Sequence, residues 1–276
     1  MAKVLKPNGQ LVTVNNHNIH VYTQGNINHP KLVFMSGSGT VAPVYDFKVL
    51  YEKMQNDFRI IVIEKFGYGY SDIFETSCDI DSLVSIQKQA LDLVGEKGPY
   101  ILVPHSMSGL EAIRWKQKYP EDIQAIIGID MATPLTYGNW TEKEVAKRIK
   151  LINLSHKLRL HKIPGCYPLN NRCLTNEEHK QHKLLMKRNA FNRCYSNEAR
   201  EVLNNAKIVS ENGNINCPVL LFSSNGKETS KNWVKSQQEF AKITNTKLIS
   251  YNCGHYMHYD KSHEIASEIK AFTMCL

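Results

Sequence analysis

The chain has 276 residues, of which 42% are hydrophobic and 22% are charged. This composition is typical of a folded globular protein and excludes the disordered, collagen-like and coiled-coil classes. The net charge of +8 comes from basic residues interleaved with Asp and Glu, and no zinc-finger, RRM-type or helix-turn-helix signature accompanies it, so we expect no nucleic-acid partner.

The first elements are short runs that end in turns. Residues 10–24 alternate in polarity on both sides of a turn at 15–18, which predicts an antiparallel hairpin at a sheet edge. Residues 31–35 form an apolar run that stops at the glycine-rich segment 36–39, as a buried strand running into a turn does.

The next segment repeats this pattern and adds a helix. Residues 58–64 are a second apolar run, and a second glycine-rich turn follows at 66–72. Apolar residues then recur at helical spacing over 79–94, where Ser77 or Asp79 is suited to cap the N-terminus. Strand, helix and the strand that follows predict a crossover between parallel strands.

The rest of the chain continues the alternation, except for a long strand-free stretch at 134–214. That stretch has helical patterns and a predicted bend at 163–168. We expect a doubly wound, mostly parallel α/β sheet from residues 1–133 and 215–276, with 134–214 inserted as a helical cap. The further strands are expected at 100–103, 123–129, 218–222 and 247–251, and the further helices at 108–119, 231–242 and 262–272.

The strand at 100–103 leads directly to a candidate nucleophile. Pro104 and His105 separate it from Ser106, and a helix with small residues at its start follows. A strained strand-to-helix turn of this kind exposes a serine hydroxyl in a cleft, and the helix N-terminus favours negative charge there. A serine that only caps the helix is the alternative. A second element, Gly254-His255, comes directly after the expected last strand, in the chain order of nucleophile then histidine.

These motifs together resemble the α/β-hydrolase superfamily, particularly its cap-bearing esterases, epoxide hydrolases, haloalkane dehalogenases and haloperoxidase-like proteins. The resemblance covers nearly the whole chain. Its four motifs occur in order, at residues 36–38, 66–72, 105–109 and 254–255.

The resemblance makes Ser106 the nucleophile and His255 its base. The glycines that usually lie two residues before and after the nucleophile are Pro104 and Ser108 in this chain. Ser108 is the rival nucleophile, ranked lower because Leu110 then occupies a position that needs a small residue. His258 is the rival base, and His105 is expected to pack and form hydrogen bonds beneath the turn.

A carboxylate must orient the histidine, and the resemblance offers two positions for it. Asp130 follows the strand at 123–129, as in the dehalogenase branch. The more common position lies after the strand at 218–222, where Lys227 stands and Glu228 is one residue later. We place Asp130 ahead of Glu228 and keep both open.

The resemblance also implies that the backbone N–H groups of Ser38 and Met107 hold an oxyanion. The segment 36–39 is not a dinucleotide-binding turn, because the glycine series is incomplete and Pro43 interrupts the helix that should follow. We therefore expect no cofactor.

The expected cap contains cysteines, histidines and basic residues. Their spacing matches no standard zinc pattern, so we expect no metal and interpret the cysteines as packing residues. The basic residues could attract an anionic substrate, but a solvated helix face is the more common explanation. The cysteines are Cys166, Cys173 and Cys194, and the basic residues include Lys147, Arg148, Lys150, Arg159, Lys187 and Arg188.

The sequence also indicates a location. No apolar run reaches about 18 residues, the length of a membrane span, and residues 1–9 lack the apolar region of a secretory signal. The seven cysteines are odd in number and include no Cys-x-x-Cys pair, which favours reduced thiols. We expect a cytoplasmic protein without a membrane partner.

The expected activity is hydrolysis of a small carboxylic ester or related acyl compound through an acyl-enzyme. Serine in the nucleophile position argues against dehalogenase and epoxide hydrolase chemistry, which the family performs with aspartate. The alternative is a nonhydrolytic or ligand-binding member of the fold with a degraded triad. The natural substrate and the oligomeric state are not indicated by the sequence.

Overall fold

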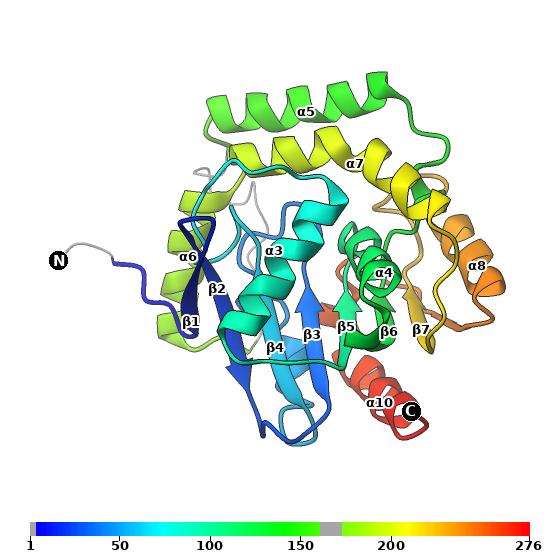
Figure 1. Ribbon diagram of the computed structural model, residues 1–276. Helices are drawn as coiled ribbons and strands as arrows, with labels where there is room; N and C mark the ends of the chain where they lie inside the picture. Colours follow the sequence, from blue (N-terminus) through cyan, green and yellow to red (C-terminus); the bar gives the residue numbers. More distant parts are fainter. Residues whose placement is uncertain (1–3, 161–172) are drawn as a thin grey trace.

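A computed structural model describes residues 4–160 and 173–276 (Figure 1). One eight-stranded sheet crosses the molecule in the order β1-β2-β4-β3-β5-β6-β7-β8. The strands are β1 Gln10–Val14, β2 His17–Gln24, β3 Lys31–Met35, β4 Arg59–Glu64, β5 Tyr100–Pro104, β6 Ile123–Ile129, β7 Val219–Ser223 and β8 Lys247–Ser250.

The sheet is antiparallel at one edge only. β1 pairs with β2 and β2 with β4 in antiparallel register, whereas all other neighbours are parallel. The edge hairpin turns at Asn15 and Asn16, which both have positive φ, as two-residue hairpin turns require. The predicted mostly parallel sheet with a hairpin edge is confirmed.

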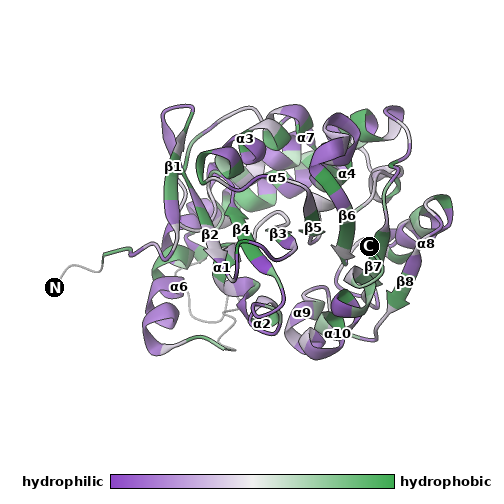
Figure 2. Cartoon of the chain, turned by 60° about the horizontal axis from the view of Figure 1, so that its bottom comes forward, coloured by the Kyte–Doolittle hydropathy of each residue, from purple (hydrophilic) through white to green (hydrophobic). Residues whose placement is uncertain are grey.

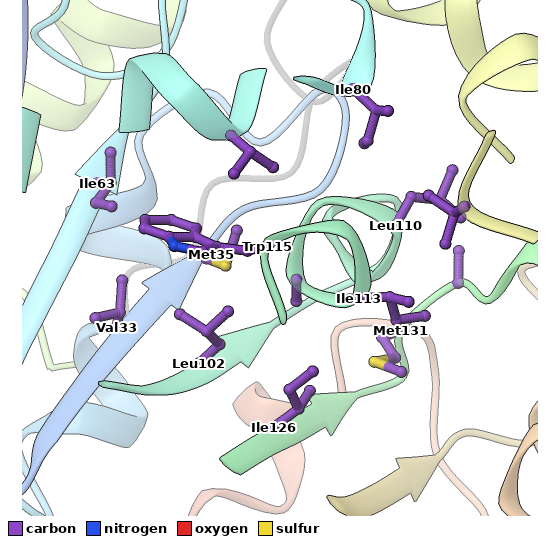
Figure 3. Close-up of a cluster of buried hydrophobic side chains, with 14 of the residues drawn as sticks. Val33, Met35, Ile63, Ile80, Leu102, Leu110, Ile113, Trp115, Ile126 and Met131 are labelled. Atoms are coloured by element: carbon purple, nitrogen blue, oxygen red, sulfur yellow. The ribbon is translucent and has the colours of Figure 1, made fainter. Parts of the chain in front are cut away.

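Helices cover both faces of the sheet. Alternate strand residues face opposite ways, so each face presents apolar side chains that a layer of helices buries. Val33 and Met35 of β3 belong to a buried cluster with residues of α3, α4 and α8, whereas Leu32 and Phe34 belong to a second cluster with α2 and α10. Figure 3 shows part of the first cluster, where Trp115 of α4 lies beside Met35. These helices are α2 Lys48–Tyr51, α3 Ile80–Leu93, α4 Ser108–Lys118, α8 Trp233–Ile243 and α10 Ser262–Thr273.

The described part of 134–214 forms helices that include α5 Glu142–Lys157, α6 Asn176–Asn189 and α7 Arg193–Glu211. α5 packs on α7, and the pair lies across the ends towards which the β3 and β5 arrows point (Figure 1). The bend expected at 163–168 lies outside the described residues. The division into a core and an inserted cap at 133/134 and 214/215 stays a prediction.

The hydropathy of the residues differs between the sheet and the outer helices. Figure 2 shows hydrophobic colour on the central strands and long hydrophilic stretches on the outer helices, α6 among them. In residues 4–160 and 173–276, none of the helices combines the length and the apolar character needed to cross a membrane.

Candidate active site

Ser106 lies in a tight turn between β5 and α4. Its φ of 58° is in the left-handed region, which costs a residue other than glycine roughly 1–3 kcal/mol and is common at active sites. The segment that follows β6 holds the turn, because the N–H of Ala132 donates to the Ser106 carbonyl at 2.7 Å. Gly109 permits this approach, since a Cβ there would lie 2.1 Å from the Ala132 oxygen.

Pro104 and Ser108 replace the expected glycines without opening the turn. Pro104 is the last residue of β5 and lies opposite Met35 in the parallel pairing with β3. The next residue resumes the ladder, because the His105 N–H donates to the Met35 carbonyl at 3.0 Å. Ser108 is fully buried, and its hydroxyl lies 2.8 Å from the Met35 carbonyl oxygen and 2.9 Å from that of His105. Ser108 thus occupies the inside of the turn.

The imidazole of His255 joins Ser106 to Asp130. Its Nε2 lies 2.9 Å from Ser106 Oγ, and its Nδ1 lies 2.6 Å from Asp130 Oδ2. Since a carboxylate can only accept, Nδ1 carries the proton and Nε2 is left to accept from the serine hydroxyl. The structure therefore brings together three residues that the sequence separates by up to 149 positions.

Asp130 is a fully buried carboxylate with a complete set of donors. It follows β6 with a positive φ of 43°. Its second oxygen accepts from the Ser224 N–H at 3.0 Å, Trp233 Nε1 at 3.0 Å and Gln237 Nε2 at 3.1 Å. Burial raises the pKa of this carboxyl, but the hydrogen bonds and charge of His255 and the bonds from Ser224 outweigh it and hold the pKa below its ordinary value. Asp130 remains ionised at neutral pH.

Glu228 contacts the same histidine at a different point. Its Oε2 accepts from the backbone N–H of His255 at 2.8 Å. The two candidate acids therefore contact different parts of His255: Asp130 binds the imidazole, and Glu228 binds the backbone N–H.

The two other histidines of this region stay neutral. His105 is buried beside the His255 ring, and its Nε2 donates to the His255 carbonyl at 3.1 Å. Burial, followed by the charge of His255, lowers the pKa of His105 to about 3. His258 is fully buried, and burial followed by the charge of His105 holds its pKa well below the ordinary value. Neither imidazole contacts Ser106.

A cavity of about 390 Å³ opens in front of these groups. Ser38 and Met107 line it on the side of Ser106, and neither backbone N–H donates to a protein acceptor in the part of the chain that the structure describes. Gly37 lies directly behind, where a Cβ would come within 2.4 Å of the Ser106 Cβ. Apolar residues of α5 and α7 also line the cavity, namely Val145, Leu151, Ile152, Ala199 and Val202.

Sequence reasoning missed two side chains that hold Asp130. Trp233 and Gln237 lie four residues apart on α8 and both donate to Asp130 Oδ1. The Trp233 ring also packs edge-on against His255, with centroids 5.2 Å apart. Their spacing puts them on one helix face, and this much can be predicted from the sequence. The sequence does not show which residue that face contacts.

Among the described residues, no group of three or more His, Cys, Asp or Glu side chains could hold a metal ion. Cys166, which belongs to the cysteine set of the expected cap, lies outside the described residues. The six described cysteines are free thiols.

Comparison with known proteins gives one curated relative and many structures. No family model matches the chain. The uncharacterized protein YbdG of Bacillus subtilis (strain 168) is 34% identical over 230 residues, which are 81% of this chain and 70% of the relative.

Three solved structures are similar along nearly their whole length. A bromoperoxidase from Bacillus anthracis has a TM-score of 0.75 at 15% identity, with 97% of this chain and 100% of that chain covered. The epoxide hydrolase VrEH1 from Vigna radiata also has a TM-score of 0.75, at 16% identity and with 97% and 98% covered. An enol-lactonase from Burkholderia xenovorans LB400 has a TM-score of 0.68 at 14% identity, with 96% and 100% covered.

The sheet, its flanking helices and these neighbours identify an α/β-hydrolase fold. The chain belongs to one family with YbdG, and its fold is that of the α/β-hydrolases.

Proposed function

We propose that the protein is a serine hydrolase that cleaves a small carboxylic ester or related acyl substrate. Ser106 is the nucleophile, His255 the general base and Asp130 the acid that orients it. The observation that carries this proposal is the continuous hydrogen-bonded series from Ser106 Oγ through His255 to Asp130, at 2.9 Å and 2.6 Å. A serine hydroxyl is inert at its own pKa and becomes a nucleophile beside such a base.

The reaction follows from this arrangement. Ser106 Oγ attacks the acyl carbon while Nε2 of His255 takes its proton, and Asp130 stabilises the resulting imidazolium. The N–H groups of Ser38 and Met107 donate to the oxyanion, an interaction worth about 10²–10³ in rate for each donor. His255 then protonates the leaving oxygen, and a water molecule activated by the same histidine releases the acid.

The alternative is a nonhydrolytic member of the fold that binds a small molecule. A buried histidine without a carboxylate partner would favour it. In this chain the His255 imidazole has a buried, fully bonded carboxylate on one side and a serine hydroxyl on the other, which supports catalysis. The solvent-open cavity beside the serine supports a small-molecule substrate rather than a macromolecular partner.

The test uses a fluorophosphonate label and a panel of p-nitrophenyl esters. The wild type should be labelled and should hydrolyse short esters, and Ser106→Ala should lose both by at least about 10³-fold. Ser108→Ala is the matched control, because Ser108 is the rival serine two residues away, and this variant should still be labelled at Ser106. Labelling that survives in Ser106→Ala would falsify the assignment.

A further inference from the structure

Arg148 is the feature of the cavity that the proposed reaction does not use. It lies on α5, one helix turn before Ile152, and contributes to the cavity wall together with Tyr137 and Trp140. Among the described residues that line the cavity, the other charged side chain is Glu228, whose carboxylate already accepts from the His255 N–H. Arg148 is therefore the cavity's available positive charge.

The guanidinium of Arg148 lies over an aromatic ring and has no salt-bridge partner among the described residues. Its central carbon lies 4.2 Å from the centroid of the Trp140 ring, an arrangement that orients a guanidinium while leaving its N–H donors available. The carboxylate of Glu144, one turn earlier, attracts this guanidinium through its charge, but its hydrogen bonds go to Thr141 in the capping box of α5.

A second hollow continues from the cavity at this point. It has a volume of about 910 Å³ and shares Trp140, Arg148 and Leu151 with the catalytic cavity. Its wall includes three further cations against one carboxylate, that of Glu144. The cations are Lys147, Lys150 and Lys231. We call this hollow the basic groove.

The two hollows thus differ in chemistry. The cavity is lined by apolar side chains that the groove lacks, those of Val145, Ile152 and Val202, whereas the charged side chains of the basic groove are mostly cations. Arg148 stands where they meet. An ester whose two halves match these surfaces has an apolar acyl group and a leaving group with a negative charge.

We propose, on the basis of the proposed hydrolase function, that the enzyme selects acyl esters whose leaving group is anionic, with Arg148 binding the anion at the mouth of the cavity. The acyl group occupies the apolar cavity. When Ser106 Oγ bonds to the acyl carbon, the bond to the leaving oxygen breaks, His255 supplies its proton, and the anionic alcohol departs through the basic groove. A carboxylate and a phosphate both meet the geometry of a guanidinium.

The test compares esters that differ in one charge. The substrates are the hexanoyl esters of meta-hydroxybenzoate and meta-hydroxybenzamide, with the hexanoyl ester of meta-hydroxyphenyl phosphate to distinguish phosphate from carboxylate. For the wild type we expect kcat/KM about tenfold higher for an anionic ester than for the benzamide ester. Arg148→Gln should remove this preference and change the benzamide rate by less than about twofold.

The control variant is Lys143→Gln. Lys143 is an exposed cation on the same helix, five positions before Arg148, and lines neither hollow. It should retain the wild-type preference. A further pair of substrates, p-nitrophenyl hexanoate and mono-p-nitrophenyl adipate, differs by a carboxylate on the acyl group. The adipate ester should be the poorer substrate, because the apolar lining of the cavity disfavours a charge.

The outcomes separate the two proposals. If hydrolysis depends on Ser106 but the rate does not depend on the charge of the leaving group, the proposed selectivity is wrong and the proposed hydrolase function is retained. The same conclusion follows if Arg148→Gln keeps the wild-type preference. A preference for the adipate ester also overturns the proposed selectivity, since the anion then belongs to the acyl half. Absence of hydrolysis for every ester, with no fluorophosphonate labelling, overturns both.

Discussion

Asp130 Oδ2 lies 2.6 Å from His255 Nδ1, inside a site where the carboxylate has no exposed surface. The bond fixes the tautomer that leaves Nε2 facing Ser106. Asp130→Asn should therefore lower kcat by about 10³–10⁴-fold with little effect on folding, because an amide can turn its NH₂ towards Nδ1 and reverse the tautomer. The measurement is steady-state hydrolysis of a p-nitrophenyl ester, with circular dichroism to check the fold.

Glu228 is the matched comparison for Asp130. Since it accepts from the His255 backbone N–H and not from the ring, Glu228→Gln should keep that acceptor and reduce kcat by no more than about tenfold. If the two variants exchanged these effects, Glu228 would be the catalytic acid and the assignment of Asp130 would be wrong.

Gly37 is predicted to tolerate no side chain. An added Cβ would lie 2.4 Å from the Ser106 Cβ, 2.9 Å from the His105 carbonyl oxygen and 3.0 Å from Ser106 Oγ, so the Ser106 side chain must move. Gly37→Ala should lower kcat and the rate of fluorophosphonate labelling by about 10²-fold or more, because a displacement of about 1 Å from the productive geometry has an effect of this size.

The control for Gly37 is Gly138→Ala. The nearest atom to a Cβ at Gly138 is the Leu135 oxygen at 3.5 Å, an ordinary contact. This variant should be as active as the wild type. Full labelling of Gly37→Ala would mean that the turn adjusts without displacing the serine.

A buried network connects α7 to the loop that carries Ser38. The hydroxyl of Tyr68 accepts from the Gly39 N–H at 3.3 Å and donates to the carboxylate of Glu198 on α7. The other oxygen of Glu198 bonds Lys65 at 2.8 Å. Because Gly39 is next to Ser38, Tyr68→Phe should lower kcat several-fold with a smaller change in KM, together with a stability loss of about 1–3 kcal/mol from the unpaired buried groups.

Tyr100→Phe separates these two effects. The Tyr100 hydroxyl is buried and donates to the Glu96 carbonyl at 2.7 Å, at the start of β5 and thus at the opposite end from Ser106. It should lose a similar amount of stability in urea unfolding and keep kcat. Equal kcat in the two variants would exclude a positioning role for Tyr68.

The fold could be predicted largely because local patterns determine it. The strand expected at 123–129 is β6, residue for residue, and the helix expected at 79–94 is α3 with its Asp79 cap, whose side chain accepts from the Ser82 N–H. A continuous apolar run in a buried strand and helical spacing in a helix are properties of neighbouring residues, so one sequence displays them.

The site could be predicted only in part, because it depends on how separate loops meet. The turn around Ser106 is formed by neighbouring residues and could be predicted. To choose between Asp130 and Glu228, one must know that β6 and β7 are neighbours in the sheet and which backbone conformation Asp130 adopts. The proposed role of Arg148 depends on which side of α5 faces the cavity. No spacing along the chain encodes these relations.

Acidification should lower the stability of the fold because one histidine is buried in it without charge. His258 is fully buried and lies among the rings of His105, Tyr256 and Tyr259, with the charge of His255 nearby. Burial holds its pKa well below 6.5. As the pH falls through about 6.5, the unfolded chain therefore gains a proton that the folded chain does not, and the free energy of unfolding decreases.

The measurement is urea unfolding between about pH 7.5 and about pH 5. Over this range one such histidine lowers the free energy of unfolding by about 1–2 kcal/mol, because each pH unit below the ordinary pKa of histidine contributes about 1.4 kcal/mol. His258→Phe should flatten the decrease by that amount, whereas His263→Gln, which changes an exposed histidine, should leave it unchanged. A pH slope that is identical in His258→Phe and the wild type would show that His258 takes up its proton in the folded state, with the imidazolium accommodated between the surrounding rings.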